Sequence, residues 1–167
     1  MISIEDVIRI AATAHKGQKD MVGNPAIQHV LAVGLMGNTE MEQKAGYLHD
    51  VVEDTDYTLA DLRAEGVEEG VLEAVDLLTH RSGMSYEDYV RNIVLSGNAT
   101  AIQVKLNDLF HNLHRAGLAM TTLDTRTKEQ KALLDEILQI ADRHDWAVQY
   151  IQASLRQLPA AYRHSPA

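Results

Sequence analysis

The sequence of 167 residues contains no cysteine, which excludes disulfide bonds and thiolate metal sites. Any bound metal must therefore be held by histidine, carboxylate or amide side chains, or by water. Aromatic residues make up only 5% of the chain, and two of its three prolines, Pro159 and Pro166, lie near the C-terminus. The scarcity of aromatics and the abundance of Leu, Ala and Glu favour helices over strands.

Long hydrophobic runs and excess basic charge are also absent. No run approaches the roughly 18 apolar residues that a membrane helix needs, and Met1–Asp6 has no basic stretch leading into an apolar one. We therefore expect a cytoplasmic protein with no signal peptide and no membrane partner. The chain has 15 Lys and Arg against 24 Asp and Glu, a net charge of −9. This charge argues against nonspecific nucleic-acid binding, but a metal and a few local cations would still admit a small phosphorylated ligand.

Helical periodicity runs through almost the whole chain, and no strand alternation is convincing. Capping patterns predict helix starts at Ser3, Thr58 and Ser85, each followed three residues later by an acid. Further helices are expected over 27–36, 40–53, 67–78, 99–114 and 126–158, the last with a break near His144-Asp145. No linker or repeat interrupts the pattern, so we expect one all-α domain over residues 1–167, folded as a compact helical bundle.

The stretch Leu48-His49-Asp50-Val51-Val52-Glu53-Asp54-Thr55 is the most informative part of the chain. His49 and Asp50 offer two adjacent metal ligands, and Glu53 and Asp54 follow three and four residues after Asp50. On one helix the three acids would share a face and repel one another. A divalent cation would remove this repulsion, whereas a solvated acidic helix face is the plain alternative.

Two more residues complete a candidate metal site. His29 lies 20 residues before His49, on the preceding helix, and Asp108 lies 58 residues after Asp50 in an otherwise apolar stretch. A buried aspartate requires a partner, and a metal ion is one. Two imidazoles and two carboxylates suit Mn²⁺, Fe²⁺, Co²⁺ or Zn²⁺. A metal in this site would lower the pKa of a bound water and generate hydroxide.

These residues fall within four ordered motifs: His15-x-Gly17-Gln18, Gly23-x-Pro25-x-Ile27-x-His29, Leu48–Thr55, and Lys105-Leu106-x-Asp108-x-x-His111-Asn112. In this order they resemble the HD-domain phosphohydrolases, and most closely the hydrolase domain of the RelA/SpoT alarmone enzymes and the small alarmone hydrolases. The resemblance covers residues 1–115, and the helices expected over 126–158 follow this motif-bearing part. It implies hydrolysis of guanosine tetra- or pentaphosphate (ppGpp or pppGpp) at the 3′ position, giving pyrophosphate and GDP or GTP.

The resemblance also implies a role for each motif residue. The metal, usually Mn²⁺ although other divalent transition metals are open, would have four ligands: His29, His49, Asp50 and Asp108. Glu53 and Asp54 correspond to the acids that orient or deprotonate the attacking water, and Asn112 to an asparagine that contacts the nucleotide. The synthetase domain of the longer enzymes has no counterpart in these 167 residues, so we expect hydrolysis and not synthesis.

Three cationic side chains are candidates for contacts with substrate phosphate. Lys105 lies one helical turn before Asp108, Arg81 is expected in a loop, and Lys19 flanks the first motif. Guanidinium and ammonium groups both suit phosphate. The alternatives are that Lys105 neutralises the neighbouring acids and that Arg81 is a solvated loop charge.

The chain departs from the family pattern at positions that bear on the substrate. Asp20 stands where the family usually has an arginine that stacks on the base, and Ala26 replaces an aromatic residue. Two alternatives therefore stay open: an HD phosphohydrolase acting on another nucleotide or a phosphorylated cofactor, and a non-catalytic nucleotide-binding module. The second is disfavoured because a binding module has little need for Glu53 and Asp54. The oligomeric state is open too, and a homo-oligomer is allowed.

Overall fold

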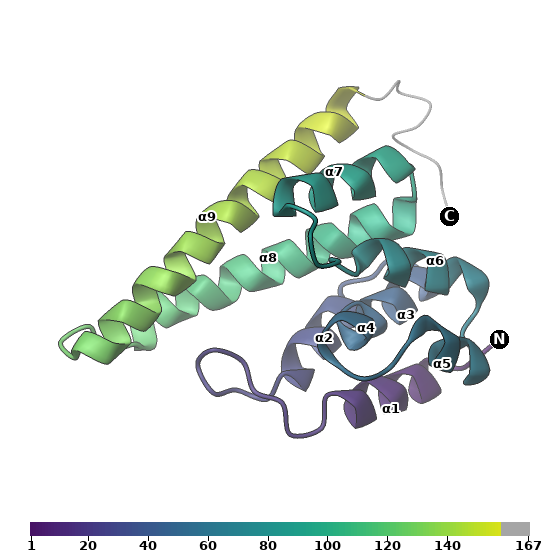
Figure 1. Cartoon of the computed structure of the whole chain (residues 1–167), viewed down its shortest axis with the longest axis horizontal. Coiled ribbons are helices and arrows are strands. Elements are labelled where there is room, and N and C mark those ends of the chain that lie inside the picture. Colours follow the sequence, from purple (N-terminus) through teal and green to yellow (C-terminus); the bar gives the residue numbers. More distant parts are fainter. Residues whose placement is uncertain (158–167) are drawn as a thin grey trace. The chain divides into compact units, whose positions relative to one another are not determined.

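The computed structural model describes residues 1–157, and helices are the regular elements of this part of the chain (Figure 1). In chain order they are α1 (Ile4–Ala14), α2 (Ile27–Leu35), α3 (Glu40–Leu48), α4 (Val51–Asp54), α5 (Leu59–Ala64), α6 (Glu69–Leu78), α7 (Tyr86–Ser96), α8 (Ala99–Thr122) and α9 (Lys128–Gln157). The prediction of an all-α fold is confirmed. Among these helices, none combines the length and the apolar character that a bilayer crossing requires.

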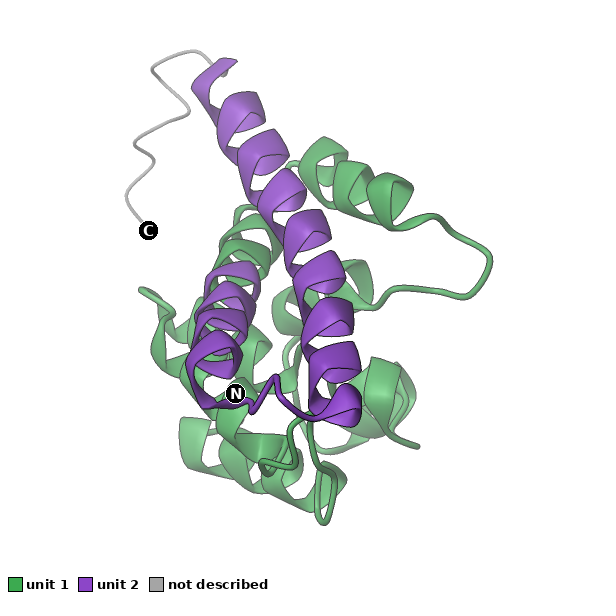
Figure 2. Cartoon of the chain, turned by 90° about the vertical axis from the view of Figure 1, so that its left-hand side faces the viewer, with its two compact units in different colours: residues 1–107 green, residues 108–167 purple. Residues whose placement is uncertain are grey.

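The chain divides into two compact units, Met1–Asn107 and Asp108–Ala167, drawn in green and purple in Figure 2. Unit 1 contains α1 to α7 and the beginning of α8, and unit 2 contains the rest of α8 together with α9. The boundary falls inside α8, directly before Asp108. The expected single domain over residues 1–167 stays a prediction.

Unit 1 is organised around α3, which packs against α1, α2 and α6. Fully buried apolar side chains from these helices, among them Val7, Val33 and Leu48, form its core, and their removal from water is the main driving force for folding. The helices α2 and α3 approach one another through two glycines. A Cβ atom built on Gly46 would lie only 2.8 Å from Cα of Gly34, so a larger residue cannot occupy this contact.

The predicted helix starts are confirmed by hydrogen bonds of the capping side chains. The hydroxyls of Ser3, Thr58 and Ser85 each accept a hydrogen bond from the backbone N–H three residues later, at the start of α1, α5 and α7. These bonds satisfy amides that the first turn of a helix leaves without a partner. Gly97 ends α7 in the left-handed conformation, with φ 66°, which glycine adopts without strain.

The helix predicted over 40–53 is wrong in one respect, because it is interrupted at the His49-Asp50 doublet. Helix α3 ends at Leu48, and α4 is a separate short helix that begins at Val51. The carbonyl oxygen of Gly46, which would accept the Asp50 amide in a continuous helix, accepts a hydrogen bond from the His49 ring at 2.7 Å. A side chain that takes up a helix carbonyl in this way competes with the next helical turn.

Unit 2 differs from the prediction at both of its helices. Helix α8 extends to Thr122 instead of ending at residue 114, because Ala116 and Ala119 are buried in a cluster with Ile137 of α9. The break expected near His144-Asp145 does not occur. Asp145 accepts a hydrogen bond from Gln149 one turn later, which supports the helix there. The predicted end of this helix, residue 158, lies outside the described residues.

Candidate metal centre and acid pair

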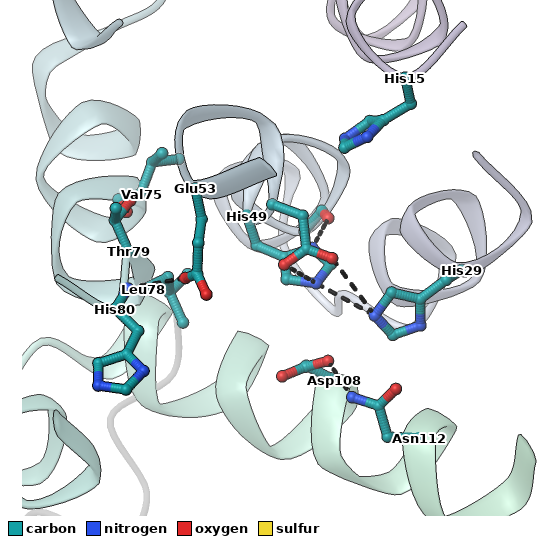
Figure 3. A network of polar contacts seen from close by, with 12 residues as sticks. His15, His29, His49, Glu53, Val75, Leu78, Thr79, His80, Asp108 and Asn112 are labelled. Carbon is teal, nitrogen blue, oxygen red and sulfur yellow. Dashed lines mark hydrogen bonds and ion pairs between the residues drawn. The ribbon is translucent and has the colours of Figure 1, made fainter. Parts of the chain in front are cut away.

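His29 on α2 meets His49, which follows the end of α3, in unit 1 (Figure 3). The Nε2 atoms of the two histidines are 3.3 Å apart. Asp50 reaches both rings, with Oδ1 3.2 Å from Nε2 of His49 and Oδ2 3.7 Å from Nε2 of His29. The two histidines are buried and Asp50 is half-buried. The structure therefore brings together three of the four predicted ligands.

The orientation of the His49 ring follows from its bond to the backbone. Nδ1 lies 2.7 Å from the carbonyl oxygen of Gly46. A carbonyl only accepts hydrogen bonds, so Nδ1 carries the proton in the neutral ring and Nε2 carries a lone pair. That lone pair points toward His29 and Asp50, which is the arrangement found in histidine ligands of metals.

The three ligand atoms lie within 4.8 Å of one another, which is close enough to share one ion. Two imidazole nitrogens and a carboxylate favour a divalent transition metal over Ca²⁺, which prefers oxygen ligands alone. The donor set thus fits the metal chemistry expected from the sequence.

Glu53 and Asp54 lie on α4, the turn that follows the doublet. Both carboxylates keep contact with solvent, yet partial burial is the main cause that raises their pKa above the ordinary value. The neighbouring charge of Asp50 raises each pKa further. The backbone N–H of His80 and the charge of Lys105 oppose the shift at Glu53. A carboxylate with a raised pKa is better suited to take up a proton near neutral pH.

Two contacts that hold the acid segment were not predicted. The Nε2 group of Gln18 donates to the backbone oxygen of Asp54 at 2.7 Å, and Oε1 of Gln18 lies 2.8 Å from Nδ1 of the buried His15. Gln18 thus connects His15 to the end of α4. The second contact is the 2.7 Å hydrogen bond from the backbone N–H of His80 to Oε2 of Glu53 (Figure 3). No sequence pattern signals it, because the donor is a main-chain group.

In unit 2, Asp108 and Asn112 lie one turn apart on α8 and are bonded to one another (Figure 3). Asp108 is buried, and its Oδ1 accepts a hydrogen bond of 2.6 Å from Nδ2 of Asn112. Arg115 in turn donates from Nη2 to Oδ1 of Asn112. Arginine only donates and a carboxylate only accepts, so the Asn112 amide has one orientation, with Oδ1 toward Arg115 and Nδ2 toward Asp108.

The three predicted phosphate contacts lie in different surroundings. Lys105 is buried in unit 1, with Nζ 5.0 Å from the centre of the Tyr89 ring. Arg81 is exposed and forms an ion pair with Asp76 of α6. Lys19 is exposed at a β-bridge with Pro25.

Asp20, at the position where the family usually has arginine, shapes the loop that contains it. Its Oδ1 accepts hydrogen bonds from the backbone N–H groups of Val22 at 3.0 Å and Asn24 at 2.8 Å. Such bonds from an aspartate to nearby amides stabilise turns. The departure from the family pattern therefore has a structural role in this chain.

Two curated relatives illustrate the similarity of this chain to known proteins, although no model of a protein family matches it. A GTP pyrophosphokinase of Streptomyces coelicolor is 33% identical over 140 residues, which cover 77% of this chain and 16% of the relative. A guanosine-3′,5′-bis(diphosphate) 3′-pyrophosphohydrolase of Haemophilus influenzae is 28% identical over 168 residues, covering 93% of this chain and 24% of the relative. The chain thus spans a quarter or less of the length of these relatives.

A solved structure described as a metazoan ortholog of SpoT that hydrolyses ppGpp matches with a TM-score of 0.64 and 22% sequence identity. The match covers 97% of this chain and 91% of that one. It shows that the two chains share the fold. The ordered motifs, the curated relatives and this fold agree, and the chain belongs to the RelA/SpoT-like family of HD-domain proteins.

Proposed function

We propose that this protein is a metal-dependent phosphohydrolase that removes pyrophosphate from the 3′ position of guanosine 3′,5′-bisdiphosphate. The observation that carries the proposal is the convergence of His29 with the His49-Asp50 doublet, which directly precedes the helical turn of Glu53 and Asp54. A nitrogen and oxygen donor set beside two proton-accepting carboxylates suits attack by water on a phosphate. The relative from Haemophilus influenzae is named for this reaction, and the one from Streptomyces coelicolor is named for the synthetic direction.

The proposed metal is Mn²⁺, with four ligands: His29, His49, Asp50 and Asp108. The first three converge within unit 1. Asp108 is included because its motif resembles that of the family and because it is a buried carboxylate. When bound, the metal supplies Lewis acidity toward water and toward phosphoryl oxygens.

The other roles in the proposed reaction fall to side chains that do not bind the metal. Glu53 accepts the proton of the attacking water, which its raised pKa favours, and Asp54 orients that water. Asn112, Arg81 and Lys19 are proposed to contact the substrate. Lys105 is buried and its charge acts on Glu53, which favours a role beside this carboxylate over contact with a solvated phosphate. The net charge of −9 favours a small-molecule substrate over nucleic acid, and we place the activity in the cytoplasm.

The decisive experiment measures pyrophosphate release from guanosine tetraphosphate by metal-depleted protein refilled with Mn²⁺. We expect rapid release that depends on Mn²⁺ and is lost in His49→Ala. Glu53→Gln should still bind Mn²⁺, seen as a Mn²⁺-dependent rise in Tm, but should turn over about 10²–10⁴-fold more slowly. Full activity of Glu53→Gln would contradict its assignment as the base.

An alternative substrate is favoured by one observation, the presence of Asp20 where the family usually has a base-stacking arginine. The same assay run on a panel of phosphorylated nucleotides and cofactors tests it. Release from another compound, with none from guanosine tetraphosphate, would keep the metal mechanism and replace the substrate. Nucleotide binding without turnover under every divalent metal would instead identify a non-catalytic module.

A further inference from the structure

Glu53 is held by a segment that lies far from it in the sequence. Its Oε2 accepts the backbone N–H of His80, 27 residues later, at 2.7 Å (Figure 3). His80 lies in the connection between α6 and α7. Because the donor belongs to the main chain, the position of the carboxylate depends on the conformation of this connection and not on the flexibility of a second side chain.

The His80 ring is fixed on two sides. It stacks on the ring of Tyr89 from α7, with centroids 4.7 Å apart and planes inclined by 20°. Its Nε2 lies 2.8 Å from the carbonyl oxygen of Met84, so Nε2 is the protonated nitrogen and donates. The ring therefore links the start and the end of the connection.

Tyr89 holds the same connection at a second point. Its hydroxyl donates to the carbonyl oxygen of Leu78 at 2.5 Å, two residues before His80. Tyr89 is buried, and Nζ of Lys105 lies 5.0 Å from the centre of its ring. A cation over an aromatic face is attracted to it. One aromatic side chain thus contacts the ring of His80, the end of α6 and the buried ammonium group.

We propose that His80 and Tyr89 are positioning residues for Glu53: together they fix the main-chain amide that binds Oε2 and leave Oε1 to accept the proton of the attacking water. This inference rests on the proposed function. The amide donates to a charged oxygen, so the bond is of the stronger, charge-assisted kind. A base held in this way needs little reorganisation when the reaction occurs, and a misplacement of about 1 Å can cost on the order of 10²-fold in rate.

Three substitutions separate the contacts. His80→Ala keeps the backbone N–H but removes the stacking and the bond to Met84. Tyr89→Phe removes only the bond to Leu78, whereas Tyr89→Leu also removes the aromatic ring. We expect kcat to fall about 10-fold in His80→Ala and Tyr89→Leu and less in Tyr89→Phe, with KM and Mn²⁺ affinity unchanged. Ser82→Ala, an exposed position in the same connection, is the matched control and should behave as wild type.

A double substitution tests the route through Glu53. In a Glu53→Gln background, Tyr89→Leu should lower kcat no further, because the base that it positions is already removed. An independent second loss of rate would overturn the proposal. So would a change in KM or Mn²⁺ affinity with kcat intact.

A measurement without substrate keeps this inference separate from the proposed function. Amide hydrogen exchange of His80 should be slow in wild type and accelerate both in Glu53→Ala and in Tyr89→Leu, with circular dichroism showing that the helices persist. Slow exchange of this amide in both variants would overturn the positioning role, whatever the substrate proves to be. Accelerated exchange with no turnover of guanosine tetraphosphate would instead support the positioning role and count against the proposed reaction.

Discussion

Gly34 and Gly46 are in backbone contact, and this contact underlies the candidate metal centre. A Cβ atom on Gly46 would lie 2.8 Å from Cα of Gly34, and a Cβ atom on Gly34 would lie 2.2 Å from the ring of Tyr47. The close approach of α2 and α3 brings His29 and His49 to 3.3 Å between their Nε2 atoms. The Gly46 carbonyl also fixes the His49 ring, so one residue sets both the spacing and the orientation of a ligand.

Substituting Gly46 by alanine should therefore disturb stability and metal binding together. Overpacking of this kind typically costs about 1–3 kcal/mol, and each kcal/mol lowers Tm by about 2–4 °C in a chain of this size. We expect the Mn²⁺-dependent rise in Tm to shrink as well, because the two histidines are pushed apart. Scanning calorimetry with and without Mn²⁺ measures both effects.

Gly117 provides the matched control for that substitution. It lies inside α8, and a Cβ atom there would meet no atom within 4 Å. Gly117→Ala should be neutral or should stabilise the protein by up to about 1 kcal/mol, the difference in helix propensity. If Gly46→Ala behaved like Gly117→Ala, the close contact would not be what determines the spacing of the ligands.

The acid pair should make the metal-free protein less stable as the pH rises. The pKa of Glu53 and that of Asp54 are raised above their ordinary values of 4.5 and 3.8, first by burial and then by the charge of Asp50. Between the ordinary and the raised pKa, the folded chain holds protons that the unfolded chain has lost. The contribution of these two groups to the free energy of unfolding therefore decreases as pH rises through this window, and the loss persists at neutral pH.

Amide substitutions should relieve this loss. Glu53→Gln and Asp54→Asn remove the titrating groups, so each variant should be more stable than wild type at pH 7 without metal and should differ less at pH 4. Urea unfolding across this range measures the difference. Asp61 serves as a control of opposite sign, because hydrogen bonds from Thr58 lower its pKa and Asp61→Asn should destabilise at neutral pH. A Glu53→Gln variant that is less stable than wild type at pH 7, or whose advantage over wild type does not grow between pH 4 and pH 7, would contradict the assignment.

The conformation of the loop around Asp20 should depend on one carboxylate oxygen, Oδ1 of Asp20. Asp20→Asn keeps an oxygen at the position that accepts the N–H groups of Val22 and Asn24, so the loop should persist. Asp20→Ala removes the acceptor, and hydrogen exchange of these two amides should then accelerate by about 10-fold or more, corresponding to the roughly 1.5 kcal/mol at the lower end of what a hydrogen bond to a charged group contributes.

The same position allows a test of substrate recognition. Asp20→Arg introduces the residue usual in the family but also removes the loop acceptor. We therefore expect Asp20→Arg to raise turnover of guanosine tetraphosphate only slightly, because the loss of the loop bonds offsets the gain from stacking on the base. A large gain over Asp20→Asn, with unchanged amide exchange, would show that the loop bonds do not limit recognition.

If Asp108 is the fourth metal ligand, as proposed above, Arg115 should influence the affinity for Mn²⁺ through Asn112 and Asp108. Its bond to Oδ1 of Asn112 turns Nδ2 of this amide toward the carboxylate. Losing a group that orients a metal ligand typically costs about 10–100-fold in affinity, so Arg115→Met should weaken Mn²⁺ binding by about 10-fold, and Arg115→Lys should weaken it less. Isothermal titration measures these affinities. In an Asn112→Ala background Arg115→Met should have no further effect, and an undiminished effect would exclude this route.

The helix starts could be predicted from the sequence because each depends on neighbours within the same turn. Ser3, Thr58 and Ser85 cap helices through bonds to residues three positions later. The order of the motifs likewise identified His29 and the His49-Asp50 doublet, which the structure brings together.

Tertiary structure decided the rest. The contact of Gly34 with Gly46 depends on how closely two helices pack. The bond from the His80 amide to Glu53 cannot be predicted from the sequence, because every residue except proline carries the same backbone donor. Local side-chain chemistry can be read along the chain, whereas contacts made by the backbone exist only once distant segments have packed together.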